Sequence, residues 1–310
     1  MSTGNAQSRS FLKLKIGELS GRDSDASQGW GLLRQLLSLA VFLHALGLFV
    51  LVFRMHDTNF GSFLFMVLEF EDASAVAIEK ATVTAFLLLS GLNLFYKNPD
   101  ILVALFLYIF FEAWAGYFQG GYHFSNLSLA TYALRYLTPV ALLAFVAGKS
   151  LTLAKRQLQA SRILQLGIAL VFASHGVECL LGNPKFIDLL LGGSWNLLGL
   201  QMSQDTALQL MQLIGVVDLA VALAILIRPL RLLLFWASFW GLLTALSRMF
   251  ALGTGAYPEV LLRASHFLGP FSLYLLLFQP AWAREFSPKG FVRRTVAFFK
   301  WKPKFHTENP

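Results

Sequence analysis

The chain has 310 residues, of which 56% are hydrophobic and 14% are charged, and its formal net charge is +8. Soluble domains carry about 25% charged residues, so the composition excludes an ordinary soluble protein and indicates a protein of the lipid bilayer. The single cysteine, Cys179, excludes an internal disulfide and any two-thiol redox motif.

Apolar segments follow one another along the chain after a polar opening. Residues 1–31 lack the apolar core of a cleavable signal peptide, and we expect them to form a cytoplasmic tail. A spanning helix needs about 20 mainly apolar residues. The segments that meet this requirement are 32–53, 75–95, 101–119, 127–148, 162–182, 206–227, 231–252 and 257–279. The sequence therefore predicts an all-α, polytopic integral membrane protein with about eight transmembrane helices.

Two further segments interrupt this series of spans. Residues 60–70 are too short to cross a bilayer, and residues 184–202 are too rich in glycine. Each lies between the first and second predicted span of its half of the chain. We therefore expect both to be interfacial or re-entrant pieces.

The two halves of the chain repeat one layout: a long apolar run, a mixed segment and three more apolar runs. Three landmarks recur in the same order, namely a histidine, a loop proline and a triplet that ends in proline. They are His44 and His175, Pro99 and Pro229, and Leu137-Thr138-Pro139 and Leu268-Gly269-Pro270, at separations of 131, 130 and 131 residues. We interpret this pattern as a tandem duplication, and four spans in each repeat make the two repeats parallel.

The duplication divides the chain into four parts. The expected parts are a polar cytoplasmic N-terminal tail (1–31), a first four-helix repeat (32–150), a second four-helix repeat (151–280) and a basic cytoplasmic C-terminal tail (281–310).

Most lysines and arginines fall in the segments that this arrangement places on one side of the membrane. These segments are 1–31, the connection at 97, the linker 149–156, the connection 228–231 and the tail from 284. The positive-inside rule makes this side cytoplasmic. Because the basic residues lie next to helix ends, the expected partners are membrane lipids and not nucleic acid.

Ionisable residues inside the apolar runs mark the predicted site, because such side chains cost at least a few kcal/mol at membrane depth. In the second repeat they are His175, Glu178, Asp218, Arg248, Arg263 and His266. Counted from the ends of the spans, five fall in the outer half of the membrane and Asp218 lies deeper. We predict that they meet in one ligand pocket open to the non-cytoplasmic side, where the arginines would anchor an anion or a carbonyl and the histidines would carry protons.

Two other interpretations of these residues stay open. They could form internal ion pairs, such as Glu178 with Arg263 or Asp218 with Arg248, that only stabilise the bundle. They could also hold a metal through His175, Glu178 and His266, although no HxxxH or CxxC spacing supports a metal site. We predict neither a metal site nor a catalytic residue.

The second repeat carries a short pattern of polar and small residues in RILQLGIALVFASHGVECLLGNPKF (162–186) and in residues 215–249. This pattern resembles the DoxX-like superfamily of four-helix membrane proteins. The first helix of that family typically has an Arg, a Gly about five residues later, then His-Gly and a Lys. Its second helix has a Gly followed by an acidic residue. The matching residues are Arg162, Gly167, His175, Gly176, Gly215 and Asp218. Cys179 stands where the family has Lys, and Asp218 replaces its usual Glu. The resemblance reaches the first repeat only through the duplication.

DoxX-like proteins are associated with membrane redox systems, including a subunit of thiosulfate:quinone oxidoreductase and a protein required for methylamine dehydrogenase maturation. The resemblance implies an accessory or structural subunit of a quinone-linked redox complex in the bacterial inner (plasma) membrane, whose pocket contacts a quinone or a lipid head group. The sequence has no nucleotide, haem, flavin or Fe–S motif, so redox cofactors would belong to other subunits of the complex.

Two further functions remain as alternatives. A transporter or channel for a small solute or anion would suit parallel repeats with charges at membrane depth. An enzyme acting on a lipid or quinol, with His175 or His266 as base, ranks last because no pair of nucleophile and base stands out in the sequence.

Overall fold

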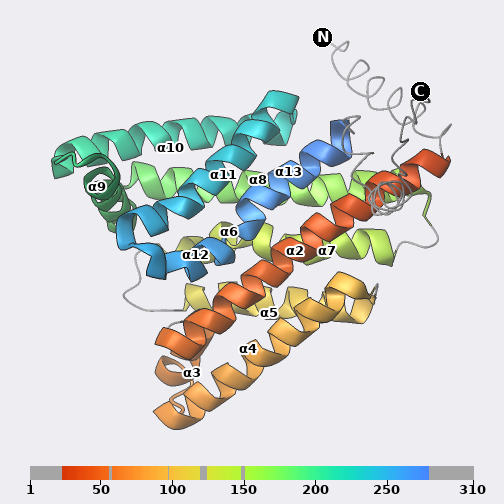
Figure 1. Ribbon diagram of the computed structural model, residues 1–310, viewed down its shortest axis with the longest axis horizontal. Helices are drawn as coiled ribbons and strands as arrows, with labels where there is room; N and C mark the ends of the chain where they lie inside the picture. The colour runs from red at the N-terminus through yellow and green to blue at the C-terminus, as the bar shows by residue number, and fades with distance from the viewer. Residues whose placement is uncertain (1–22, 56–57, 97, 119–123, 148–150, 279–310) are drawn as a thin grey trace, which may run out of the picture.

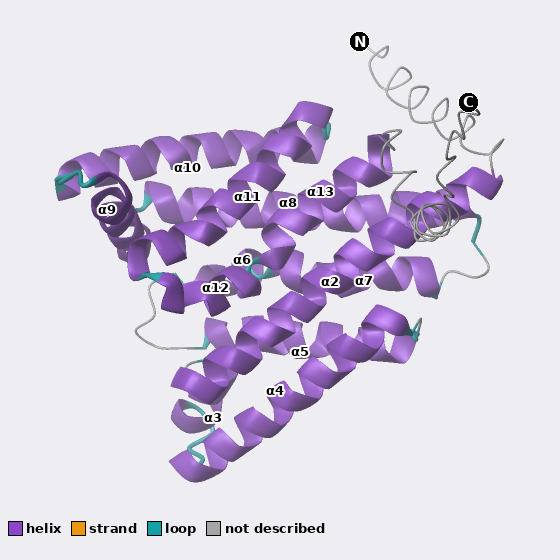
Figure 2. Ribbon diagram, viewed as in Figure 1, coloured by secondary structure: helices purple, strands orange, loops and turns teal. Residues whose placement is uncertain are grey.

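The structure is a computed structural model that describes residues 23–55, 58–96, 98–118, 124–147 and 151–278. In these ranges all regular structure is helical and no strand occurs (Figure 2). The helices are α2 (Asp23–Met55), α3 (Asn59–Met66), α4 (Asp72–Phe95), α5 (Pro99–Tyr117), α6 (Ser128–Thr131), α7 (Ala133–Val146), α8 (Leu153–Leu180), α9 (Pro184–Leu198), α10 (Gln204–Ile227), α11 (Arg231–Leu252), α12 (Tyr257–Leu262) and α13 (Ala264–Phe278), with 3₁₀ turns η1 (Ser125–Leu127) and η2 (Thr254–Ala256). The predicted tail 281–310 and most of the tail 1–31 lie outside the described residues.

Among the described residues, seven helical segments are long and apolar enough to cross a membrane. They are Gly31–Arg54, Asp72–Phe95, Pro99–Tyr117, Ser125–Val146, Leu153–Leu180, Gln204–Ile227 and Arg231–Leu252. The pair Thr254–Leu262 and Ala264–Phe278, bent by 47°, makes an eighth span if it is counted as one. The fold confirms the prediction of an all-α polytopic membrane protein with about eight spans.

Polar residues in the connections determine where several helices begin. Asn98 accepts a hydrogen bond from the backbone of Asp100 at the start of α5, and Ser203 accepts one from Thr206 at the start of α10. These are N-cap bonds, which satisfy amide groups that a helix leaves without a partner. At the end of α9, Gly199 adopts a φ of +63°, a left-handed conformation that glycine reaches without strain.

The two halves of the chain contain the same elements in the same order. A long first helix (α2, α8) is followed by a short helix (α3, α9), two spans (α4, α10 and α5, α11), a 3₁₀ turn with a short helix, and a last helix with an internal proline (α7, α13). The last span of each half is broken at one residue, Tyr132 in the first and Arg263 in the second. These breaks lie 131 residues apart, the same separation as the repeated histidines.

The repeats pack against each other through exchanged contacts. The first helix of each repeat lies against the last span of the other, so that α2 contacts α12 and α13 while α8 contacts α6 and α7 (Figure 1). One polar contact joins the repeats in the core, between Nδ1 of His44 and the Leu262 carbonyl at 2.9 Å. Fully buried leucine and isoleucine side chains, among them Leu37, Leu134 and Ile168, make these contacts a single core.

The direction of the helices is the same in both repeats. In Figure 1 the first described residues of α2 and the last of α13 lie at one end of the bundle, and α3 and α9 lie at the opposite end. The short helix α9 is seen nearly end-on, crosswise to the spans. It is held to the end of α11 by hydrogen bonds from Asn196 to the carbonyls of Phe250 and Ala251, at 3.1 and 3.0 Å.

Candidate functional site

A pocket of about 380 Å³ lies in the second repeat, between α8, α9, α10, α11 and the junction of α12 with α13. Its walls are mainly apolar, with Phe172 from α8, Leu190 from α9 and Ile214 from α10. Its volume falls in the range of about 300–1,000 Å³ that small-molecule sites occupy. Such a chamber, apolar with a few polar groups, suits an organic ligand.

The structure brings the six residues predicted from the sequence together around this pocket. Five of them line it: His175, Asp218, Arg248, Arg263 and His266. The sixth, Glu178, is buried behind His175 and bonds to it, with 2.8 Å between Nδ1 of the histidine and Oε2 of the glutamate. These residues come from four different elements of the fold, so it is the packing of the helices that assembles the group.

The two histidines of the pocket lie side by side. The ring centroids of His175 and His266 are 5.8 Å apart. Because Glu178 occupies Nδ1 of His175, Nε2 is the nitrogen of that ring left for a ligand. His266 is buried, and its Nε2 has no hydrogen-bond partner among the described residues.

Small residues allow the helices to approach closely around the site. A Cβ at position 241 of α11 would overlap the backbone carbonyl of His266, so glycine is required there. A Cβ on Gly215 of α10 would lie 2.7 Å from the carbonyl of Gly176 in α8. This is the small-residue contact found between membrane helices, and it gives a packing role to both glycines.

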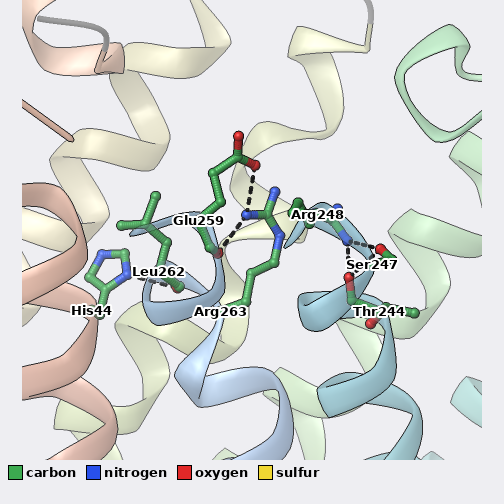
Figure 3. A network of polar contacts seen from close by, with 7 residues as sticks. All are labelled: His44, Thr244, Ser247, Arg248, Glu259, Leu262 and Arg263. Carbon is green, nitrogen blue, oxygen red and sulfur yellow. Dashed lines mark hydrogen bonds and ion pairs between the residues drawn. The ribbon is translucent and has the colours of Figure 1, made fainter. Parts of the chain in front are cut away.

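The two arginines of the pocket have different partners (Figure 3). Arg263, at the break of the last span, donates to the carbonyl of Glu259 at 2.8 Å and forms an ion pair with its carboxylate at 3.3 Å. Arg248, on α11, donates to the carbonyl of Thr244 and to Oγ of Ser247, the latter at 3.3 Å. Its Nε has no partner among the described residues.

The ion pairs suggested by the sequence, Glu178 with Arg263 and Asp218 with Arg248, do not form. Glu178 pairs with His175 three residues before it, and Arg263 pairs with Glu259 four residues before it. Neighbours at these spacings already share a helix face, so these pairs need no contact between helices. A pairing between distant spans requires a helix rotation that the sequence does not define.

Asp218, on α10, lines the pocket without an ion-pair partner among the described residues. It has a side-chain hydrogen bond with Trp240, and its Oδ1 has no partner among the described residues. Within those residues no three His, Cys, Asp or Glu side chains form a group that could hold a metal ion.

Several residues of the site were not predicted from the sequence. Trp240, Thr244 and Ser247 of α11 line the pocket, and α9 covers one side of it. Two features of the sequence indicate these residues. Thr244 precedes Arg248 by one helical turn and so shares its face. In α9, the lining residues Phe186, Leu190, Gly193 and Leu197 recur at helical spacing, as on an amphipathic helix.

The corresponding place in the first repeat is filled by its own short helix. The carboxylate of Glu112 accepts hydrogen bonds from the backbone of Asn59 and Phe60 at the start of α3, at 3.0 and 3.1 Å. At the separation of 130 residues that relates Pro99 to Pro229, Phe118 corresponds to Arg248. The ring of Phe118 lies 6.4 Å from that of Phe63 in α3, centroid to centroid, and a Cβ on Gly116 would lie 2.6 Å from Nδ2 of Asn59, so α3 packs closely against this end of α5.

The fold and the pocket define the class of the protein as an all-helical integral membrane protein with a ligand-sized pocket in its second repeat. Comparisons with protein-family models, with curated proteins and with solved structures find no match to the chain. The geometry of the pocket therefore carries the functional argument.

Proposed function

We propose that the protein binds an amphiphilic molecule, a quinone or the head group of a lipid, in the second-repeat pocket and serves as an accessory subunit of a quinone-linked membrane redox complex. The observation that supports this most directly is a set of buried polar atoms in an apolar chamber without partners among the described residues. They are Oδ1 of Asp218, Nε of Arg248 and Nε2 of His266. Each costs about 1–3 kcal/mol when unsatisfied, and a ligand with oxygen atoms in its head could satisfy several of them.

The position of the pocket suits a ligand that arrives from the membrane. Leu197 and Leu198 line the pocket and are also exposed on the surface of the helix bundle. The pocket thus borders the surface that lipid would cover. A molecule could place its head among the polar groups and keep part of its chain in the bilayer.

The role in a redox complex is supported by the resemblance of the second repeat to DoxX-like proteins. Four of the six residues of that resemblance belong to the site: His175 and Asp218 line the pocket, and Gly176 and Gly215 let α8 and α10 approach. In this proposal the protein lies in the bacterial inner membrane with both termini cytoplasmic, and the redox cofactors belong to its partner subunits.

Purification from the native membrane in mild detergent tests this function, with mass spectrometry of co-purifying proteins and retained small molecules. We expect a quinone or lipid and a redox partner in fixed ratio. Leu190→Trp, which fills the pocket, should release the small molecule, whereas Leu232→Trp on the exposed side of α11 should retain it. Equal retention by both variants, or no retained molecule and no partner, would contradict the proposal.

Transport of a small anion is the second function that an observation favours. The last span is broken at Arg263 with a bend of 47°, and this break lines the pocket. Broken spans line the substrate sites of several transporter folds. Reconstituted vesicles that take up a labelled anion, and lose this uptake with Leu190→Trp, would support transport over the accessory role.

A further inference from the structure

We infer that the pocket selects an amphiphilic anion, whose acidic head group is held by Arg248 beside Arg263 and whose chain lies against the apolar walls. The inference rests on the proposed pocket and decides between its two ligand classes, because a quinone is neutral and a fatty acid or acidic phospholipid is charged. The shared chemistry is an oxyanion, carboxylate or phosphate, attached to an acyl chain.

The first argument is that the guanidinium group of Arg248 is buried without a counter-charge among the described residues. Its side chain belongs to a residue that is only 7% exposed, at membrane depth on α11. Its hydrogen-bond partners are two neutral oxygens, the Thr244 carbonyl and the Ser247 hydroxyl, and no carboxylate of the described residues lies within ion-pair distance. A buried guanidinium without a counter-charge is expensive, so an anion at this position would be strongly favoured.

The second argument is that the two carboxylates that act on Arg248 are already paired with other side chains. The charges that act on Arg248 are the cations Arg263 and Arg135 and the anions Glu259 and Glu178. Glu259 is paired with Arg263, and Glu178 is paired with His175. Arg135 stacks over the ring of Tyr132 at 4.1 Å and interacts with Glu112 of the first repeat. Of the two arginines that line the pocket, Arg248 is thus the one that no carboxylate of the described residues contacts.

The third argument is geometric. Arg263 extends from the break of the last span towards the end of α11, where Arg248 lies, and both side chains line the same pocket (Figure 3). Guanidinium groups present several N–H donors in a plane that matches carboxylate and phosphate oxygens. Nε of Arg248 is buried and has no partner among the described residues, so turning this N–H towards a ligand would break no hydrogen bond at that atom.

The fourth argument concerns the rest of the ligand. Apart from Asp218, Ser194 and the polar residues near Arg248, the lining contributed by α9, α10 and α11 is mainly apolar and includes Leu190, Ile214 and Leu243. The lining reaches the exposed Leu197 and Leu198. A small hydrophilic anion would leave this surface uncovered, whereas an acyl chain would bury it, at about 25 cal/mol per Å² of apolar surface removed from water.

Binding to the delipidated full-length protein in a neutral detergent tests the inference. The probes are oleate, oleyl alcohol with the same chain and no charge, decylubiquinone, phosphatidylglycerol and acetate. Affinity is measured by native mass spectrometry and by the shift of the thermal unfolding midpoint. We expect oleate or phosphatidylglycerol to bind at least about tenfold more tightly than oleyl alcohol or decylubiquinone, since one charge-assisted hydrogen bond contributes about 1.5–3 kcal/mol. The stronger of the two acids identifies the source of the anion.

Two arginine variants make the assignment specific. Arg248→Gln should abolish the preference for oleate over oleyl alcohol, and Arg248→Lys should retain part of it. Arg156→Gln is the matched control, because Arg156 also donates to backbone carbonyls, those of Leu151 and Phe145, and does not line the pocket. It should leave the preference unchanged. If Arg248→Gln does not accumulate, the comparison of oleate with oleyl alcohol on the unaltered protein decides by itself.

Other results would overturn the inference in distinguishable ways. Tighter binding of decylubiquinone than of oleate would refute the anion and leave the proposed pocket intact. Acetate binding as tightly as oleate would refute the acyl chain and favour transport of a small anion. Absence of binding by every probe would refute both the inference and the proposed function.

Discussion

Gly215→Ala is the substitution whose cost follows most directly from the structure. A Cβ at this position would lie 2.7 Å from the carbonyl oxygen of Gly176 and 3.0 Å from the amide nitrogen of Leu180. Both are backbone atoms of α8, so no side-chain rotation relieves the overlap, and α8 and α10 must move apart. Overpacking of this kind costs about 1–3 kcal/mol, and the better helix propensity of alanine returns about 0.5–1 kcal/mol. We expect the free energy of unfolding to fall by about 1–2 kcal/mol.

The single cysteine provides the assay for this prediction. Cys179 is buried and lies on α8, within four residues of Gly176. Cys179 also lines the pocket but is only 4% exposed, so a bulky thiol-reactive fluorophore should label it much faster when this region opens, and the rise in labelling during heating gives an unfolding midpoint. Gly91→Ala in α4 is the control, because the nearest atom to its Cβ would be Cε2 of Phe42 at 3.9 Å, an ordinary contact. Equal midpoints for Gly215→Ala and Gly91→Ala would refute the close contact of α8 with α10.

Three further predictions follow from hydrogen bonds and from the order of the spans. His44→Leu removes the 2.9 Å bond to the Leu262 carbonyl between the repeats and should cost about 1–3 kcal/mol; an unchanged midpoint in the thiol assay would contradict this tether. Gln165→Leu removes two bonds to carbonyls at the end of α10, at 2.8 and 2.9 Å, and should cost about 1–2 kcal/mol. Hydrogen exchange should then increase at that end of α10 and not at its start. Finally, Asn98→Cys and Asn196→Cys should be labelled by a membrane-impermeant reagent from opposite sides of the membrane, and labelling from one side would contradict the alternation of eight spans.

The spans could be predicted from the sequence because the bilayer sets their length. An apolar run such as 206–227 can satisfy its backbone hydrogen bonds in a bilayer by forming one helix. The structure has a single helix there, Gln204–Ile227. The order of elements that the sequence repeats is also found in both halves of the structure. The break at Arg263 could not be predicted in this way, because the apolar run continues through it from 257 to 279 and hydrophobicity does not record the direction of the helix axis.

The candidate site, too, could be predicted only in part from the sequence. The six ionisable residues were recognised by their cost inside apolar runs, a property that each residue has by itself. The two ion pairs that stayed open as an alternative, Glu178 with Arg263 and Asp218 with Arg248, are not formed in the structure, because pairing between spans depends on the rotation of each helix. The cover formed by α9 was missed because its apolar stripe is the same whether it faces lipid or a pocket.

The exchanged packing of the repeats has a consequence for the origin of the molecule. Since α2 lies against α12 and α13, and α8 lies against α6 and α7, one repeat by itself would leave its first helix without the surface that covers it here. Two separate copies of a four-span protein would restore that surface by associating as a symmetric pair. Fusion of two such copies into one chain would leave them free to diverge, and in the present chain one half has a chamber lined by Arg248 while the other packs its short helix against Glu112.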